Sequence, residues 1–543
     1  MAIVVHLKKS YRKWCTDGTV FVTGAAFKGS DELLTAELLC NALKNVSTCE
    51  DFVKLIDSIN GFFACVVNKG NQLFAAVDRI RSIPIFYTLK EGHIYISDDA
   101  EWLRNEINDN KFDVFSEQEM LLTGYVTRES TLFPNIKQLQ AGEYLFFKMD
   151  GKEPSFVREY YFRYFHENLL DVDNCHDLFK ELDVQLESAM HRLIGFASGR
   201  QIVIPLSAGY DSRSIALMLG RLKYKNVLCF SYGIKENDES ETSRKVANYL
   251  QFKWVFVEYS EDEWRTWWNT EERKEYFQWA ANWSSFAITQ DWAAVWMLKK
   301  RGVIDKNAVF VPGHTPLSCE QHIPVEVKTL SHFDESMLLQ KIFCSHYHLV
   351  DYKKLGLRSN SFLDKMDIMS RKVFDGFDYA DSYQEWEYRE RQAKFIVNNT
   401  RVYEFWGFDW WLPLFDVEFC RFWLKMPLNK RIGKVFFIEY VDRFYESIIK
   451  NTDAIPKQIK KKTFLSVIRL KLKRKFVFGT SFLPGRGNVT APYGKYSTEI
   501  IRKFRSVVKK TNGFGAIQYI HENLRYSSFL KHYVDRLSGH KSR

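Results

Sequence analysis

The sequence of 543 residues has few of the features that mark secreted, metal-clustered or membrane-spanning proteins. Its nine cysteines are scattered singly, with no Cys-x-x-Cys pair and no His/Cys group at zinc spacing, which predicts free thiols in a reducing compartment. No apolar run approaches the ~18–20 residues that a membrane span needs, and the first residues lack the apolar segment and cleavage site of a signal peptide. These absences predict a cytoplasmic protein with no membrane partner.

Two further features are missing. The sequence has no internal repeat and no low-complexity segment, which excludes solenoid and fibrous architectures. It also lacks the Gly-Lys-[Ser/Thr] ending of a Walker A loop, so γ-phosphoryl transfer of the GTPase type is not predicted. The formal net charge of +10 permits contact with phosphates or nucleic acid without requiring it.

The pattern of apolar residues predicts two domains. Residues 1–151 alternate short strands and turns with amphipathic helical stretches at 32–43 and 115–122, which is typical of an α+β domain. Residues 152–175 have no clear period and are predicted to be a linker. From residue 176 helices alternate with short, continuous apolar strands, which predicts a parallel sheet covered on both faces. From about residue 333 to residue 543 the chain is predicted to be mainly helical, with a basic tail.

One polar stretch, PLSAGYDSR at 205–213, lies between a predicted strand and a predicted helix. Small residues there let backbone N–H groups and the helix dipole approach an anion, and Ser207 and Ser212 add hydroxyl donors. Asp211 would repel a phosphate unless a divalent cation lay between them. In a parallel sheet, ligands bind at the carboxyl ends of the strands, so the stretch predicts a site for ATP with Mg²⁺. A simple Ser/Asp helix cap is the alternative.

PLSAGYDSR resembles the Ser-Gly-Gly-x-Asp-Ser pyrophosphate loop of the asparagine synthetase superfamily. Residues 230–250 resemble the segment that flanks adenine and ribose in this family. Residues 401–419 resemble its Glu-x-Arg-x-Pro-Phe-x-Asp segment, matching at Pro413 and Asp416.

Residues 59–87 and 124–145 resemble the class II glutamine amidotransferase domain of the same superfamily. The matching residues are Asn60, Gly61, Phe63, Ala64, Asp78, Arg79, Pro84, Tyr87, Thr131, Leu132, Phe133, Leu139, Gly142 and Glu143.

The resemblance implies a fold and an activity. The fold would be an Ntn-like αββα sandwich followed by an α/β PP-loop domain, Rossmann-like (HUP), with a parallel sheet and a helical C-terminal extension. The activity would be that of an AMP-forming carbon–nitrogen ligase of the asparagine synthase type, which activates a carboxylate as an acyl-adenylate and transfers it to ammonia or an amine. The implied partners are a small-molecule carboxylate and an ammonia or amine donor, with a separate ammonia source as an option; no nucleic-acid partner is expected.

The resemblance also assigns the site residues. ATP and pyrophosphate would be bound by Leu206, Ser207, Gly209, Asp211, Ser212, Ser231, Gly233 and Gly313. Asp211 and Glu320 would hold the metal, and Asp409, Trp411 and Asp416 would contact the substrate. By its spacing to Phe464, Lys461 would stabilise the charge on the departing pyrophosphate.

Three departures from the family pattern shape the mechanism. Residue 2 is Ala2, where family glutaminases carry a cysteine nucleophile, so no glutaminase activity is expected. The stretch PGHTPLSCEQHIP at 312–324 lacks the family's Asp-Glu pair; Glu320 would replace it from a shifted position, and His314 is either a general base or an ordinary loop histidine.

The third departure is Trp411, which stands where the family has arginine and argues against free aspartate as the substrate. A flat apolar side chain would suit a sugar ring, such as a uronic acid of a surface polysaccharide. Closure of a peptide macrolactam and asparagine formation itself stay open. An RNA-modifying adenylating enzyme and a catalytically inactive scaffold are the alternatives from other functional classes.

Overall fold

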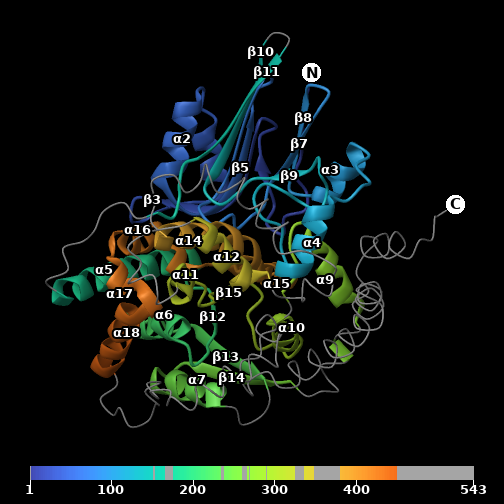
Figure 1. Cartoon of the computed structure of the whole chain (residues 1–543). Coiled ribbons are helices and arrows are strands. Elements are labelled where there is room, and N and C mark those ends of the chain that lie inside the picture. Colours follow the sequence, from blue (N-terminus) through green and yellow to red (C-terminus); the bar gives the residue numbers. More distant parts are fainter. Residues whose placement is uncertain are drawn as a thin grey trace.

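The computed structural model describes residues 2–150, 153–165, 175–233, 238–259, 266–267, 270–288, 290–323, 335–347 and 379–448. Figure 1 shows two regions, each built around β-sheet. The strands of the first lie above those of the second, and helices from the last third of the described chain lie along the boundary.

The first region contains two sheets. One has the strand order β1-β8-β7-β9, and the other has the order β11-β10-β6-β5-β3-β2 with β4 beside β3. The strands are β1 (Ile3–His6), β2 (Cys15–Thr16), β3 (Val20–Lys28), β4 (Glu32–Leu34), β5 (Ile59–Asn68), β6 (Gln72–Val77), β7 (Phe86–Lys90), β8 (His93–Ser97), β9 (Lys137–Gln138), β10 (Glu143–Asp150) and β11 (Glu153–Tyr160). The helices are α1 (Ala36–Leu43), α2 (Cys49–Ser58), α3 (Ala100–Glu106) and α4 (Val114–Thr123).

Three apolar clusters set the layers of this region. Alternate residues of the two sheets, such as Val66 and Ile96, pack between the sheets. A second cluster, with Phe52 at its centre, covers the outer face of the larger sheet with α1 and α2. A third, which includes Leu103 and Met120, packs α3 and α4 against β7 of the smaller sheet. The layers therefore follow the order helix, sheet, sheet, helix.

The second region is built on a five-stranded sheet in which every pair is parallel, with the order β14-β13-β12-β15-β16. Its elements up to the middle of the chain are α5 (Cys175–Ala197), β12 (Ile202–Pro205), α6 (Tyr210–Arg221), β13 (Val227–Gly233), α7 (Asp238–Tyr249), β14 (Lys253–Glu258), α9 (Glu271–Ala281), α10 (Trp292–Lys300), β15 (Val309–Phe310), α11 (Leu317–His322) and α12 (Glu335–His346). They continue with α14 (Tyr379–Glu387), the π-helix η3 (Tyr388–Ile396), η4 (Val397–Asn399), α15 (Thr400–Phe405), β16 (Asp409–Trp410), η5 (Pro413–Phe415), α16 (Val417–Lys425), α17 (Leu428–Arg431), η6 (Ile432–Lys434) and α18 (Val435–Ile448).

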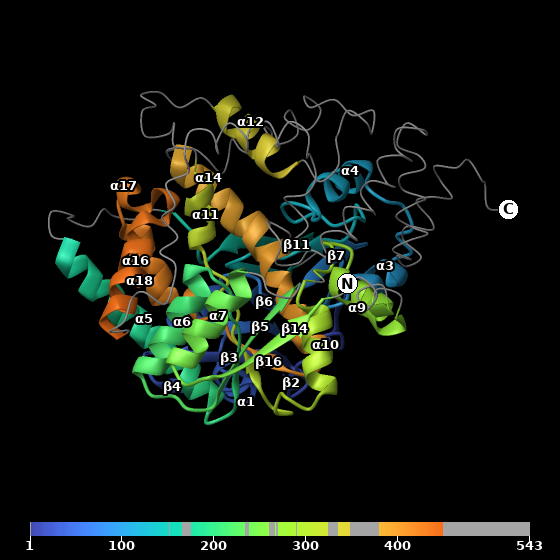
Figure 2. The same cartoon turned by 90° about the horizontal axis from the view of Figure 1, so that it is seen from below.

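The strand order reverses at β12. From this central strand the chain moves through β13 to β14 on one side and then returns to β15 on the other. Figure 2 shows α7 and α10 on opposite sides of β14. A reversal of this kind leaves a crevice outside the carboxyl ends of the central strands, where open α/β sheets bind ligands.

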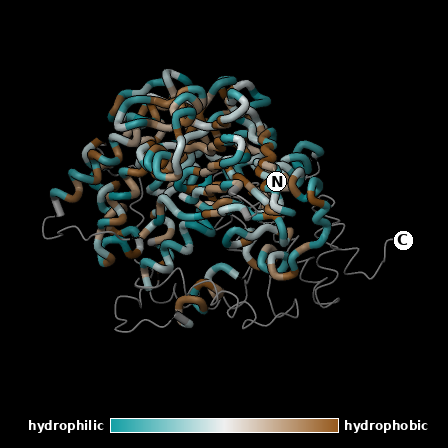
Figure 3. Tube along the Cα trace, turned by 90° about the horizontal axis from the view of Figure 1, so that it is seen from above, coloured by the Kyte–Doolittle hydropathy of each residue, from teal (hydrophilic) through white to brown (hydrophobic). Residues whose placement is uncertain are grey.

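The two regions share one apolar core. The largest cluster contains Phe27 and Phe62 of the first region together with Phe196 and Trp411 of the second. Figure 3 shows many hydrophilic stretches along the outline of the molecule and apolar stretches in its interior. Within the described residues, no helix is both long enough and apolar enough to cross a membrane.

Most predicted elements are present, with three differences. The predicted linker at 152–175 is wrong at its start, because β11 pairs with β10 along its whole length and extends the first sheet to Tyr160. The predicted helix at 32–43 begins only after Thr35, which caps α1. The predicted helical part contains a short strand, β16. The basic tail lies outside the described residues.

Candidate functional site

The turn between β12 and α6 lies at the point where the strand order reverses. Leu206 continues the pairing of β12, since its N–H donates to the carbonyl of Phe230 at 2.9 Å and its carbonyl accepts from Ser231 Oγ at 3.2 Å. Gly209 has φ −70° and ψ 155° and begins the helix, with no side-chain cap among the described residues. The first N–H groups of α6 therefore face the turn as an anion-binding end.

Two serines organise this turn. The N–H of Ser207 donates to Ser212 Oγ at 3.2 Å, and the two hydroxyl oxygens are also 3.2 Å apart. The N–H of Gly209 donates to Ser207 Oγ at 3.0 Å. The hydroxyls thus fix the turn before a ligand arrives, as a preorganised phosphate site requires.

Backbone groups of Ala208 in the same turn are held from two sides. Arg213 donates from Nη2 to the Ala208 carbonyl at 2.7 Å and lies over the Tyr210 ring. Burial raises the pKa of the Glu239 carboxyl, while a hydrogen bond from the Ala208 backbone lowers it. Neither Arg213 nor Glu239 was identified from the sequence.

Asp211 lies in the first turn of α6 and pairs with a lysine that the sequence did not reveal. Lys434 Nζ is 3.0 Å from both carboxylate oxygens of Asp211. The lysine side chain is only 7% exposed, while that of Asp211 is 25% exposed. Gly433 and Lys434 both have left-handed backbones, with φ 71° and 61°. Such strain in a non-glycine residue is typical of functional positions. The only sequence signal is a Gly-Lys pair before an apolar helix.

Gly313 brings a second strand end against this turn. A Cβ atom at this position would lie 2.7 Å from the backbone N of Ser212, so only glycine lets the loop after β15 approach α6 so closely. The predicted role of Gly313 beside the turn therefore has a steric reason.

His314 follows next in the same loop. Burial lowers the pKa of its imidazole to about 4, although the Asp291 carboxylate acts in the opposite direction. Its Nδ1 atom is buried without a hydrogen-bond partner in the described part of the chain. Asp291 accepts from Tyr232 Oη at 2.6 Å and from Tyr403 Oη at 2.7 Å. A neutral imidazole with an unused nitrogen is suited to accept a proton.

The other predicted ATP-binding residues lie on β13, next to β12. Ser231 contacts Leu206 as described, and the carbonyl of Gly233 accepts from the Tyr259 N–H at 2.7 Å. Glu320 belongs to α11, and Lys461 lies outside the described residues.

The arrangement fits a hydrated cation better than a closed metal site. Within the described ranges, no three His, Cys, Asp or Glu side chains gather to hold a metal ion. Asp211 offers one carboxylate beside the hydroxyls of Ser207 and Ser212. Mg²⁺ is usually bound by one or two carboxylates together with substrate phosphates and water, so this donor set fits magnesium bound with a nucleotide.

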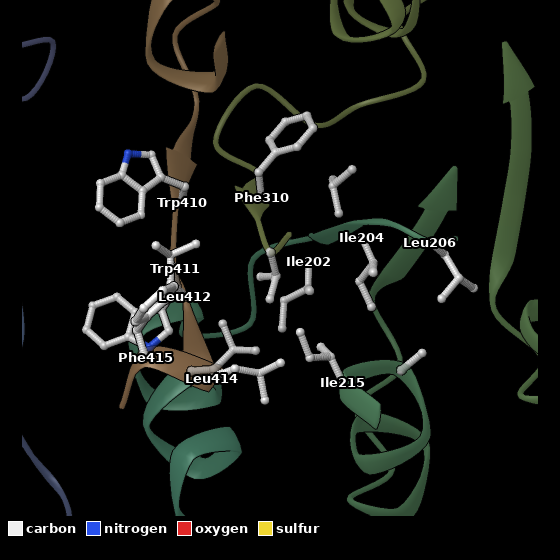
Figure 4. Packing of buried hydrophobic residues seen from close by; sticks show 14 of the residues in the cluster. Ile202, Ile204, Leu206, Ile215, Phe310, Trp410, Trp411, Leu412, Leu414 and Phe415 are labelled. Carbon is white, nitrogen blue, oxygen red and sulfur yellow. The ribbon is translucent and has the colours of Figure 1, made fainter. Parts of the chain in front are cut away.

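The structure contradicts the predicted substrate role of Trp411. Its ring is 2% exposed and packs against Phe27, Phe62 and Phe196, with ring centroids 5.8, 4.8 and 4.5 Å away. Figure 4 shows it among buried apolar residues beside Leu412 and Phe415. The ring has no open face for a sugar, because the neighbouring domain covers it.

Asp416 and Asp409 both accept hydrogen bonds from arginines, and their substrate roles stay predictions. Asp416 is 4% exposed and accepts from Arg192 Nε at 2.6 Å and from Asn60 Nδ2 at 2.9 Å. Asp409 accepts from Arg12 Nε at 3.1 Å and from Arg200 Nη1 at 2.6 Å. Arg12 and Asn60 belong to the first region, so both aspartates join the two regions.

Comparisons with known families match both regions. The model of the glutamine amidotransferase domain matches residues 36–161, and that of asparagine synthase matches residues 181–266. No curated protein matches the sequence.

Two solved structures are similar to parts of the chain. An NH₃-dependent NAD synthetase from Campylobacter jejuni is 12% identical, with a TM-score of 0.20, over 39% of this chain and 93% of that one. An allosteric regulatory enzyme of purine biosynthesis is also 12% identical, with a TM-score of 0.18, over 55% of each chain. At these TM-scores the likeness carries no argument about the site.

Proposed function

We propose that this chain, which belongs to the asparagine synthetase-like superfamily, activates a carboxylate with ATP as an acyl-adenylate and transfers the acyl group to ammonia or an amine. The two domain matches support an ATP-using, amidotransferase-like ligase. The proposal that the chain forms an acyl-adenylate rests on one observation. Asp211 pairs with Lys434 at the turn that contains Ser207 and Ser212.

In the first step, a carboxylate oxygen of the substrate attacks the α-phosphorus, and the bond from this phosphorus to the bridging oxygen breaks, releasing pyrophosphate. The N–H groups at the start of α6 and the hydroxyls of Ser207 and Ser212 bind the departing pyrophosphate. Lys434 is close enough to stabilise the charge that develops there. Asp211 would hold a bound Mg²⁺, which would supply charge neutralisation for the phosphates.

In the second step, ammonia or an amine attacks the acyl carbon and AMP leaves. The attacking nitrogen must lose a proton. His314 is suited to take it, because its imidazole is neutral at pH 7 and its Nδ1 atom has no other partner in the described residues.

We infer that the first domain does not hydrolyse glutamine. Residue 2 is alanine, and Cys15 lies within β2, paired with Val22. Burial raises the pKa of the thiols of Cys40 and Cys65, that of Cys65 to about 12. A nucleophilic thiol needs the opposite shift. Ammonia or the amine therefore comes from solution or from another protein.

The acyl substrate is a small carboxylic acid, with aspartate and a uronic acid as the two classes to test. Trp411 no longer favours the sugar, because its ring is buried. The choice therefore rests on an ATP–pyrophosphate exchange assay with aspartate, with hexuronic acids and their nucleotide sugars, and with tRNA.

Exchange stimulated by one acid supports the proposal and names the substrate. Exchange that needs tRNA favours the RNA-modifying alternative, and no exchange with any of them favours an inactive scaffold. Asp211→Asn should lower exchange by about 10²–10³-fold, the typical loss for a preorganised charge group. Asp305→Asn makes the same chemical change at an exposed position and should leave exchange unchanged. Equal rates in the two variants would contradict the assignment of Asp211.

A further inference from the structure

A second cleft lies away from the β12 turn, between the first region and α9. Its volume is about 360 Å³. Its walls come from the segment around Lys9, from α3 and α4, and from α9 with the turn that follows it. Of the lining residues, Phe277 and Ser285 are buried, whereas Glu275 is exposed. No residue of this cleft takes part in the reaction proposed above.

The lining is rich in negative charge. Three carboxylates, of Asp99, Glu101 and Glu275, face one ammonium group, that of Lys9. Asp99 is 2.9 Å from Lys9 Nζ, and Glu101 is 2.7 Å from Arg104 Nη2. Within the described part of the chain, Glu275 has no cationic partner. One carboxylate of the lining, that of Glu275, is therefore without a cationic partner among the described residues.

Aromatic side chains supply much of the remaining wall. Trp279 is partly exposed, and its Nε1 donates to the Lys9 carbonyl at 3.1 Å, which fixes the orientation of the indole. Trp283 Nε1 donates to Glu101 at 2.6 Å. An aromatic face beside a carboxylate attracts an organic cation, because the ring quadrupole and the negative charge both stabilise a positive group.

The turn that carries Trp283 is held in a strained conformation. Asn282 and Trp283 have consecutive left-handed backbones, with φ 42° and 57°. Hydrogen bonds to the first region hold them there: Ala100 N–H donates to Asn282 Oδ1 at 2.9 Å, and Leu132 N–H donates to the Trp283 carbonyl at 3.0 Å. Strain of this kind persists where the surroundings enforce it, and it clusters at binding sites.

We propose that this cleft binds a small organic ammonium compound, in which a primary amine is attached to an apolar or ring-shaped body. The ammonium group lies beside the Glu275 carboxylate, and the body lies against the indole of Trp279. This proposal does not depend on the ligase reaction, since binding is measured without ATP.

The test is isothermal titration calorimetry of the full chain with benzylamine and with benzyl alcohol. The two probes share the ring and differ in the cationic group. Benzylamine should bind at least about tenfold more tightly, and about 0.5 M NaCl should weaken it, because the Debye length falls to a few ångströms. No heat of binding up to about 10 mM benzylamine, or equal affinity for the alcohol, would overturn the proposal.

Three variants of α9 test whether the amine binds in this cleft. Glu275→Gln should weaken benzylamine binding by about fivefold, in the range of an exposed charge interaction. Glu272→Gln removes the same charge from the same exposed helix but does not line the cleft, and it should leave the affinity unchanged. Trp279→Leu should weaken binding of both probes. If Glu275→Gln and Glu272→Gln behave alike, the amine binds elsewhere and the proposal fails.

Discussion

Asp78 and Asp211 each follow a strand, and each belongs to a motif that resembles the same superfamily, yet their surroundings differ. Asp78 is buried and accepts from the N–H groups of Phe63 and Ile80 at 3.2 and 2.9 Å and from the hydroxyl of Ser82. Burial raises the pKa of Asp78 to about 6, although these hydrogen bonds oppose the shift. Asp211 is partly exposed and pairs with the ammonium of Lys434 beside an open helix end.

The difference extends to the two regions as a whole. In the first region, Arg79 donates to the carbonyls of Asp57 and Ile59, and Asn60 bonds Asp416 across the boundary. In the second, the turn after β12 leaves N–H groups without a side-chain cap in the described structure, and His314 has an unused nitrogen. Asp78, whose two carboxylate oxygens both accept hydrogen bonds, stabilises the fold, whereas the uncapped N–H groups after β12 are available for a ligand.

The largest expected effect tests the structural half of this comparison. Asp416→Ala should lower the free energy of unfolding by about 3–5 kcal/mol, because it leaves the guanidinium of Arg192 buried without its main partner. Urea unfolding followed by circular dichroism measures the loss. Glu418→Gln, which changes the exposed partner of the same arginine, should cost less than about 1 kcal/mol. Equal losses of unfolding free energy in the two variants would mean that the buried pair of Asp416 and Arg192 contributes no more than the exposed pair.

The next test concerns the turn after β12, where we propose that the reaction takes place. Lys434→Met keeps the length of the side chain and should reduce ATP–pyrophosphate exchange by about 10²–10³-fold, which corresponds to roughly 3–4 kcal/mol of transition-state stabilisation. Lys430→Met, four residues earlier, serves as the control for removal of a nearby lysine. If Lys434→Met has a normal rate of ATP–pyrophosphate exchange, the lysine has only a structural role as the partner of Asp211.

A smaller effect is expected where the two strand ends meet. Gly313→Ala should destabilise the fold by about 1–3 kcal/mol and raise the KM for ATP, because its Cβ would collide with the backbone of Ser212. Gly195→Ala is the matched control, since its Cβ would have ordinary contacts at 3.4 Å with the Phe27 ring. A change in stability without a change in KM would separate the glycine from the nucleotide site.

The smallest effect is a pH dependence. The pKa of His314 is about 4 in the folded chain and 6.5 without the surroundings. Between these values the unfolded chain takes up a proton that the folded chain does not, so stability falls as the pH falls below about 6.5. The free energies of unfolding from urea titrations at pH 7.5 and pH 5.5 should differ by about 1 kcal/mol more in the unmodified protein than in His314→Asn. If the stability of both proteins has the same pH dependence, the His314 imidazole is exposed to solvent.

Local patterns in the sequence predicted the strand-to-helix turn at 205–213 but not the residues that pack around it. The buried strand before Ser207 and the glycine at 313 follow from residue type and spacing, because small residues and a strand-to-helix turn act over short distances. Lys434 reaches Asp211 across 223 positions of chain, and only the packing of α18 against α6 brings them together. Trp411 was misinterpreted for the same reason, since two of the rings that bury it, those of Phe27 and Phe62, lie in the other region.

The apolar cluster that contains Phe27, Phe62 and Trp411 joins the two regions without a layer of solvent between them. Separation of the two regions would expose these aromatic rings and would also break the hydrogen bond between Asn60 and Asp416. We therefore expect the two halves to melt together in a single calorimetric peak, in contrast to the independent transitions of loosely tethered modules. If the two regions are expressed as separate fragments, we expect them to fold only when they are mixed.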